Sequence, residues 1–86
     1  MIRLVDIKVA GPGALDLGFS DGTSGTWSAK ELIERETVLT RPLADQDFFA
    51  RAFLDAGALA WPNGLELSGS SLHAKLGGAG QLRRRA

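Results

Sequence analysis

The residues best suited to nucleophilic catalysis lie close together near the C-terminus. His73 is the only histidine, and Ser70 and Ser71 precede it by three and two residues. A histidine beside a serine could act as the general base for a serine nucleophile. Nothing around either serine resembles a nucleophile elbow, however, and a serine ahead of Leu72 at helical spacing is typical of a helix N-cap. We therefore expect His73 at the surface and no catalytic residue in this segment.

The other residues capable of chemistry form no recognisable site. One histidine, no cysteine and dispersed carboxylates do not match the ligand spacing of a metal site. Asp16, Asp21, Glu31 and Glu34 could supply a carboxylate pair for acid–base catalysis, but exposed hairpin and helix faces carry such charges for solubility. The glycine-rich segments GPG, SDGTSG and LGGAG match neither the P-loop nor the dinucleotide-binding motif. The sequence predicts no enzyme, no metal and no cofactor.

A few large or charged residues are candidates for binding. Trp27 and Trp61 could form a binding platform, because aromatic rings are enriched at interfaces, or they could pack in the core. Asn63, in the sequence Trp-Pro-Asn-Gly, is a further candidate at this corner. The consecutive arginines Arg83, Arg84 and Arg85 could contact phosphate or an acidic partner, but three cations supply few phosphate contacts.

Composition limits the classes of function. Residues 1–82 carry seven basic and ten acidic side chains, a net charge of −3, which does not favour a general nucleic-acid binder. The 86 residues, of which 44% are hydrophobic, suit one domain. We expect a single α+β domain over residues 1–76 and a flexible Gly/Arg tail over 77–86. Asp6 and Lys8 interrupt the N-terminal apolar run, which excludes a signal-peptide core or membrane span there; with no cysteine, a cytoplasmic location is expected.

Alternating apolar residues predict a β-meander over residues 2–28. The strand-like alternation places two sets of side chains on buried faces: Val5, Ile7 and Val9, then Leu15, Leu17 and Phe19. Asp21-Gly22 is suited to a tight hairpin turn, so a third strand should end near Trp27. We expect the first strand to be half-buried through its valine and isoleucine face.

The meander should lead into a short helix. Ser28 and Glu31 have the spacing of a capping box, in which each side chain bonds the backbone amide of the other. Ala29, Leu32 and Ile33 lie on one side of a helix that begins here. β-Branched Thr37 and Val38 disfavour its continuation, so we expect about two turns.

The segment from Asp45 to Gly57 fits two structures. A helix would have acidic caps at its start and Gly57 at its end, whereas a strand would place Ala52, Leu54 and Ala56 on one face. The pattern alone favours the helix. Beyond it, Pro62 requires an extended Trp61, and Pro62–Gly64 predicts a turn. Serines 68, 70 and 71 can cap a last short helix that ends at Gly77-Gly78.

Three segments together resemble a small bacterial family, number 2442 among the domains of unknown function. They are LDLGFSDGT, WSAKELIE and PLADQDFFARAFLDAGALAWPNGLELSGSSL, and the resemblance covers residues 4–72. Its most specific parts are Asp21-Gly22 and Trp61–Gly64; Glu66 departs from it, because an aspartate is usual there. The resemblance implies an α+β fold with a single turn over 45–49 and a strand over 50–56. A hairpin of that strand with 58–61 would give Phe53 cross-strand partners near Trp61.

The resemblance also implies a class of function. Family members look like accessory proteins: some are joined to a helix-turn-helix domain, and many are encoded beside another small protein in a layout similar to toxin–antitoxin pairs. We therefore expect a non-enzymatic interaction or regulatory module, of antitoxin-like kind, that docks on a small protein partner. The alternatives are a weak nucleic-acid-associated regulator that uses Arg83–Arg85, and a small enzyme. Exposed strand edges would also allow a homodimer.

Overall fold

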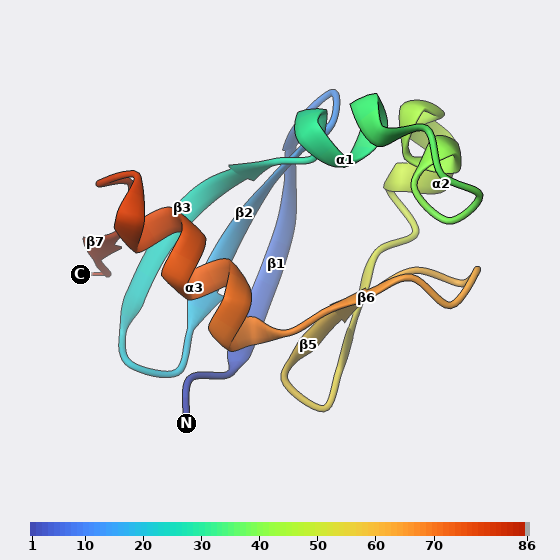
Figure 1. The fold of residues 1–86 in the computed structure, drawn as a ribbon. Helices are drawn as coiled ribbons and strands as arrows, with labels where there is room; N and C mark the ends of the chain where they lie inside the picture. Colours follow the sequence, from blue (N-terminus) through green and yellow to red (C-terminus); the bar gives the residue numbers. More distant parts are fainter. Residues whose placement is uncertain (86) are drawn as a thin grey trace.

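The computed structural model describes residues 1–85 and shows an α+β fold, as predicted (Figure 1). The strands are β1 (Leu4–Gly11), β2 (Ala14–Phe19), β3 (Thr23–Ser28), β4 (Phe53–Asp55), β5 (Ala58–Ala60), β6 (Glu66–Leu67) and β7 (Arg83–Arg84). The helices are α1 (Lys30–Arg35), the 3₁₀ helix η1 (Arg41–Ala44), α2 (Gln46–Phe49) and α3 (Gly69–Gly78). No helix within residues 1–85 has the length and apolar character needed to span a membrane.

The first sheet contains the predicted meander. Its strand order is β1-β2-β3-β7, and all neighbouring strands are antiparallel. Gly22 adopts a positive φ of 85° in the β2–β3 turn, and its amide donates to the carbonyl of Phe19 at 3.1 Å. Leu15, Leu17 and Phe19 of β2 are all buried, so the alternation predicted for this strand is confirmed.

Strand β1 differs from the prediction. Val5 and Val9 are 50% and 41% exposed, whereas Leu4 is buried. The pairing with β2 shifts register between Leu4 and Asp6 and again between Val9 and Gly11. Such a β-bulge interrupts the two-residue alternation. The expected face of Val5, Ile7 and Val9 is therefore not buried as a unit.

The capping box predicted at Ser28 is also wrong. The hydroxyl of Ser28 accepts from the amide of Lys30 at 3.1 Å, and α1 begins at Lys30 rather than at Ala29. Glu31 does not return to Ser28, because its carboxylate binds Lys75 Nζ of α3 at 2.7 Å. The length of α1, six residues, agrees with the two turns expected.

The ambiguous segment contains both structures in succession. Asp45 caps α2 by accepting from the amide of Asp47, and the chain becomes extended only at Phe53. The amide of Arg51 still donates to the carbonyl of Phe48, so residues 50–52 complete the helical turn. The expected strand is thus confirmed over 53–55 and begins three residues later than expected.

The core lies between the first sheet, α3 and the smaller sheet of strand order β4-β5-β6. In Figure 1, α3 crosses one face of the first sheet and the second sheet lies beyond β1. Leu72 and Leu76 of α3 are buried against this face. A Cβ on Gly25 of β3 would lie 2.7 Å from the backbone oxygen of Gln81, so the chain after α3 approaches the sheet closely at this glycine.

The end of the chain is not a free tail. Gly77 and Gly78 belong to α3, and Arg83 and Arg84 pair with Ser24 and Thr23 of β3. After the helix, Gly80 has a positive φ of 69°, which turns the chain back along the edge of β3. This corrects the predicted domain boundary at residue 76 and the predicted tail over 77–85; Ala86 lies outside the described residues.

Candidate protein-interaction surface

The two tryptophans considered for a binding platform are in the core. Trp27 is 4% and Trp61 1% exposed, and their ring centroids are 6.3 Å apart. The indole nitrogen of Trp61 donates to the carbonyl of Phe49 at 3.0 Å. Neither ring is available to a partner, so of the two alternatives the structure has core packing and no platform.

Asn63 has a structural role at the corner. Its side-chain nitrogen donates to the carbonyl of Leu39 at 3.0 Å, and its side-chain oxygen accepts from the amide of Leu65 at 3.2 Å. Gly64 completes the turn with a φ of 93°. Both polar groups of Asn63 are thus used within the fold, and they fix the corner against the loop before η1.

The arginines lie at the edge of the first sheet. Arg83 and Arg85 line a polar basin of about 280 Å³ on the sheet face opposite α3. Arg85 Nη2 binds Asp6 Oδ2 at 3.1 Å, and its guanidinium crosses over Gly18, where a Cβ would lie 2.3 Å from Nη1. Arg84 is the next residue of β7 and alternates to the other face.

Negative charges divide this basin. Lys8 is the third cation that lines it, and the carboxylates of Asp6 and Asp16 lie among the three cations. Asp16 faces Lys8 across the β1–β2 pair and also accepts from the hydroxyl of Thr26 at 2.6 Å. Phosphate binding needs concentrated positive charge, which this face does not offer.

His73 is hydrogen-bonded to an aspartate rather than to a serine. Its Nε2 lies 2.9 Å from Asp21 Oδ2, and its ring packs edge-on against Phe19. Hydrogen bonds from Thr23, together with His73, lower the pKa of Asp21 to about 2. Within the described residues no hydrogen bond joins His73 to a serine, since Ser71 instead donates its amide to Ser68 at the start of α3.

Large apolar side chains are exposed on β1 and β4, two strands that are neighbours in space although they belong to different sheets. All three residues of β4 are exposed, on both faces of the strand. We call the set the β1–β4 surface; it consists of Val5 (50% exposed), Val9 (41%), Phe53 (45%) and Leu54 (41%). The sequence does not predict this surface, because its pattern places the valines on a buried face and Phe53 near Trp61.

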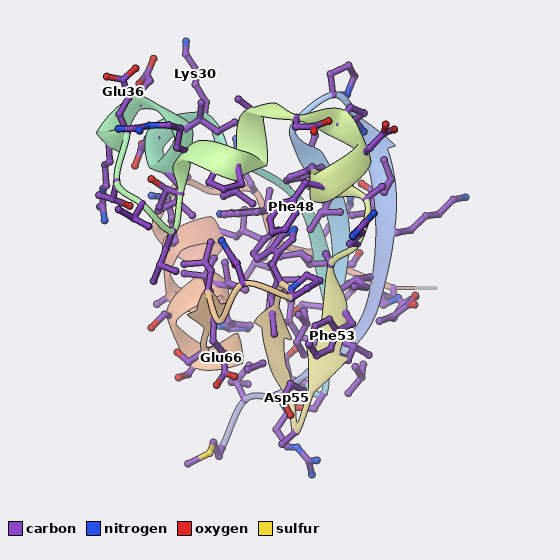
Figure 2. All side chains as sticks on the ribbon, turned by 90° about the vertical axis from the view of Figure 1, so that its right-hand side faces the viewer. Lys30, Glu36, Phe48, Phe53, Asp55 and Glu66 are labelled. Atoms are coloured by element: carbon purple, nitrogen blue, oxygen red, sulfur yellow. The ribbon has the colours of Figure 1, made fainter. Side chains whose placement is uncertain are left out.

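The partner of Phe53 across the strands explains its exposure. Phe53 pairs with Ala60, whose methyl group covers little of an aromatic ring, and Ala60 pairs in turn with Glu66. The three residues form one row across the outer face of the second sheet. Figure 2 shows Phe53, Asp55 and Glu66 on this side of the molecule.

Two carboxyl groups lie beside Phe53. Asp55 and Glu66 are close enough that a hydrogen bond and charge repulsion from Asp55 raise the pKa of Glu66. Neither forms an ion pair with a cation of residues 1–85. Two carboxylates do not make a metal site, and no group of three potential ligands exists in the described part of the chain.

Comparison of the chain with family models, with curated proteins and with solved structures gave no match.

Proposed function

We propose that the protein is a non-enzymatic interaction module that docks on a partner protein through the β1–β4 surface. The observation that carries the proposal is strand β4, which lies at the edge of its sheet and exposes Phe53 and Leu54 on opposite faces. Exposed apolar side chains on two neighbouring strands offer hydrophobic area that a partner can bury, and such patches mark protein-interaction sites.

The other features of the chain support binding better than catalysis. The one histidine is engaged by Asp21, and the carboxyl pair of Asp55 and Glu66 lies on an open sheet face, where water is not excluded. The resemblance to family 2442 supports the same proposal, and with it a bacterial regulatory subunit of antitoxin-like kind that acts in the cytoplasm.

A nucleic-acid-associated regulator is the second candidate, favoured by the position of Arg83, Arg85 and Lys8 on one face of the first sheet. The acidic residues among these cations make it the weaker candidate. Binding of this kind would be lost at moderate salt and after removal of the arginines.

Affinity capture with matched variants tests the proposal. The bait is the full chain, wild type or with Val5→Ser and Phe53→Ser together, expressed in cells with its chromosomal neighbours and treated with nuclease. Val38→Ser is the control, because Val38 is an equally apolar residue, 85% exposed, in the loop after α1. We expect one stoichiometric protein with wild type and with the control but not with the double variant. Capture that is unaffected by the double variant, or that nuclease abolishes, would contradict the proposal.

A further inference from the structure

A small pocket lies on the outer face of the second sheet, beside the β1–β4 surface. Phe53, Asp55, Ala60 and Glu66 all line it, and we call it the β4–β6 pocket. Phe53 pairs with Ala60 and Ala60 with Glu66, so a methyl group forms the floor between two larger side chains. Asp55 lies two residues after Phe53 and therefore on the same face of β4. The pocket thus has an aromatic ring on one side and carboxyl groups on the other (Figure 2).

The size of the β4–β6 pocket limits what can occupy it. Its volume is about 250 Å³, and Phe53, Asp55 and Glu66 are all exposed to solvent. Pockets for small-molecule ligands usually measure about 300–1,000 Å³ and enclose most of the ligand. A pocket this small and open suits one side chain of a partner that lies across the surface.

The charge of the pocket is not neutralised within the chain. No cation of residues 1–85 forms an ion pair with Asp55 or Glu66. The hydrogen bond and repulsion from Asp55 raise the pKa of Glu66, an effect that a neighbouring cation would reverse. A side chain that enters the pocket must therefore carry positive charge.

The ring of Phe53 distinguishes between the two common cations. It is 45% exposed, and aromatic rings attract arginine more often than lysine. The guanidinium group is planar, stacks on a ring and has five donors, enough to serve two carboxylates at once. A lysine ammonium is compact and strongly hydrated, so it matches the carboxylates but not the ring.

From these observations we propose that the partner docks with an arginine side chain in the β4–β6 pocket, its guanidinium between Asp55 and Glu66 and against the ring of Phe53. The inference rests on the proposed function and names the chemistry of the partner segment. Apolar residues beside this arginine would extend over the exposed side chains of β1. The partner lies over the surface and adds no strand to β4, because β4 lies beside β1 of the same chain.

A titration of the full chain with the peptide acetyl-Leu-Arg-Val-amide, followed by amide NMR, tests the inference. A contact of this size should have a Kd of about 1–10 mM, so the peptide is added up to about 20 mM. We expect the largest shifts in residues 53–66. The same peptide with lysine should bind about threefold more weakly, and with citrulline, the uncharged analogue of arginine, about tenfold more weakly. No binding of the arginine peptide, shifts elsewhere, or equal affinity for the lysine or citrulline peptide would overturn the inference.

A charge-removing variant tests the two carboxylates. Asp55→Asn and Glu66→Gln together should weaken binding of the arginine peptide about tenfold, because both ion pairs are lost. This double variant also relieves the repulsion within the pair, so its folding is not at risk. Glu34→Gln with Asp47→Asn is the control, since it removes the same charge from exposed positions on α1 and α2. Equal affinity of the two double variants would contradict the inference.

The pKa of Glu66 gives a further measurement that a purely structural role would not change. Carboxyl NMR should show a lower pKa of Glu66 when the arginine peptide is bound, because the cation favours the carboxylate. If the peptide does not bind but the Val5 and Phe53 double variant loses its captured partner, the proposed function stands and the arginine site fails. If the peptide binds but capture is unaffected, only the proposed function fails.

Discussion

Glu66 and Asp55 place two carboxyl groups on one open face of the second sheet. The hydrogen bond and charge of Asp55 raise the pKa of Glu66 above its usual value of 4.5, so the folded state binds this proton more tightly than the unfolded chain. Above the pKa that Glu66 has in the folded state, repulsion between the two carboxylates therefore lowers the free energy of unfolding. This effect disappears as the pH falls below about 4.5, because Glu66 is then protonated in both states.

We therefore predict that Glu66→Gln raises the melting temperature at pH 7 and leaves it nearly unchanged at about pH 3.5, where Glu66 is neutral in both states. Thermal unfolding at the two pH values measures the difference. Glu34→Gln, on the exposed face of α1, is the matched control. A lower melting temperature at pH 7 would show that Glu66 stabilises the fold as an anion, contrary to this account.

Single residues also show why side-chain type alone did not locate the exposed β1–β4 surface. A domain of 86 residues has few large rings with which to fill a core. Trp61 is buried, and its indole nitrogen donates to the carbonyl of Phe49, whereas the smaller Phe53 is exposed opposite Ala60. Exposure depends on the residue across the strand, which composition does not reveal.

At the scale of elements, two glycines of the first sheet lie in close contact with other parts of the chain, Gly25 with a backbone segment and Gly18 with side chains. A Cβ on Gly25 of β3 would lie 2.7 Å from the backbone oxygen of Gln81, which is held by the bond from its own amide to Leu76. A Cβ on Gly18 of β2 would meet the end of the Arg85 side chain, which can move away, and would lie 3.2 Å from the Cβ of Asp6.

We predict that Gly25→Ala lowers the free energy of unfolding by about 2 kcal/mol, since the segment after α3 must shift from β3. Gly18→Ala should cost less than about 1 kcal/mol, the value of the exposed Arg85–Asp6 pair that it would displace. Urea unfolding of both variants gives the comparison. Equal decreases in the free energy of unfolding for both variants would contradict this account, because they would mean that the segment after α3 shifts as easily as the Arg85 side chain.

The elements that the sequence predicted correctly are those fixed by local chemistry. The Asp21-Gly22 turn and the alternation of β2 depend on adjacent residues, and both were confirmed. The capping box failed because Glu31 binds Lys75, which lies 44 residues away in the sequence. The β4 strand needed the resemblance to family 2442, since helix and strand patterns overlap there. The β1–β4 surface was not predicted, because the bulge in β1 and the position of the second sheet are properties of the tertiary structure.

At the scale of the whole molecule, the first sheet joins the two ends of the chain. Strand β1 forms one edge and β7 the other, and Arg85 reaches across the sheet to Asp6, which is 79 residues away in the sequence. The amide of Arg85 also donates to the carbonyl of Gly22 at 2.8 Å. Because of these contacts, we expect residues 83–85 to unfold together with the rest of the domain.

Removal of residues 83–86 tests whether the chain end stabilises the domain. The deletion removes the β3–β7 pairing, the bond to Gly22 and the ion pair with Asp6, and we expect the free energy of unfolding to fall by about 1–2 kcal/mol. Arg85→Ala, the control, removes only the exposed ion pair and should cost less than about 1 kcal/mol. Urea unfolding followed by tryptophan fluorescence suits the measurement, because Trp27 and Trp61 are buried far from the deletion in sequence. If residues 83–86 were a frayed tail, their removal would leave the free energy of unfolding unchanged. Because β7 pairs with β3, its removal also exposes the edge of β3, and we expect the truncated chain to aggregate more readily.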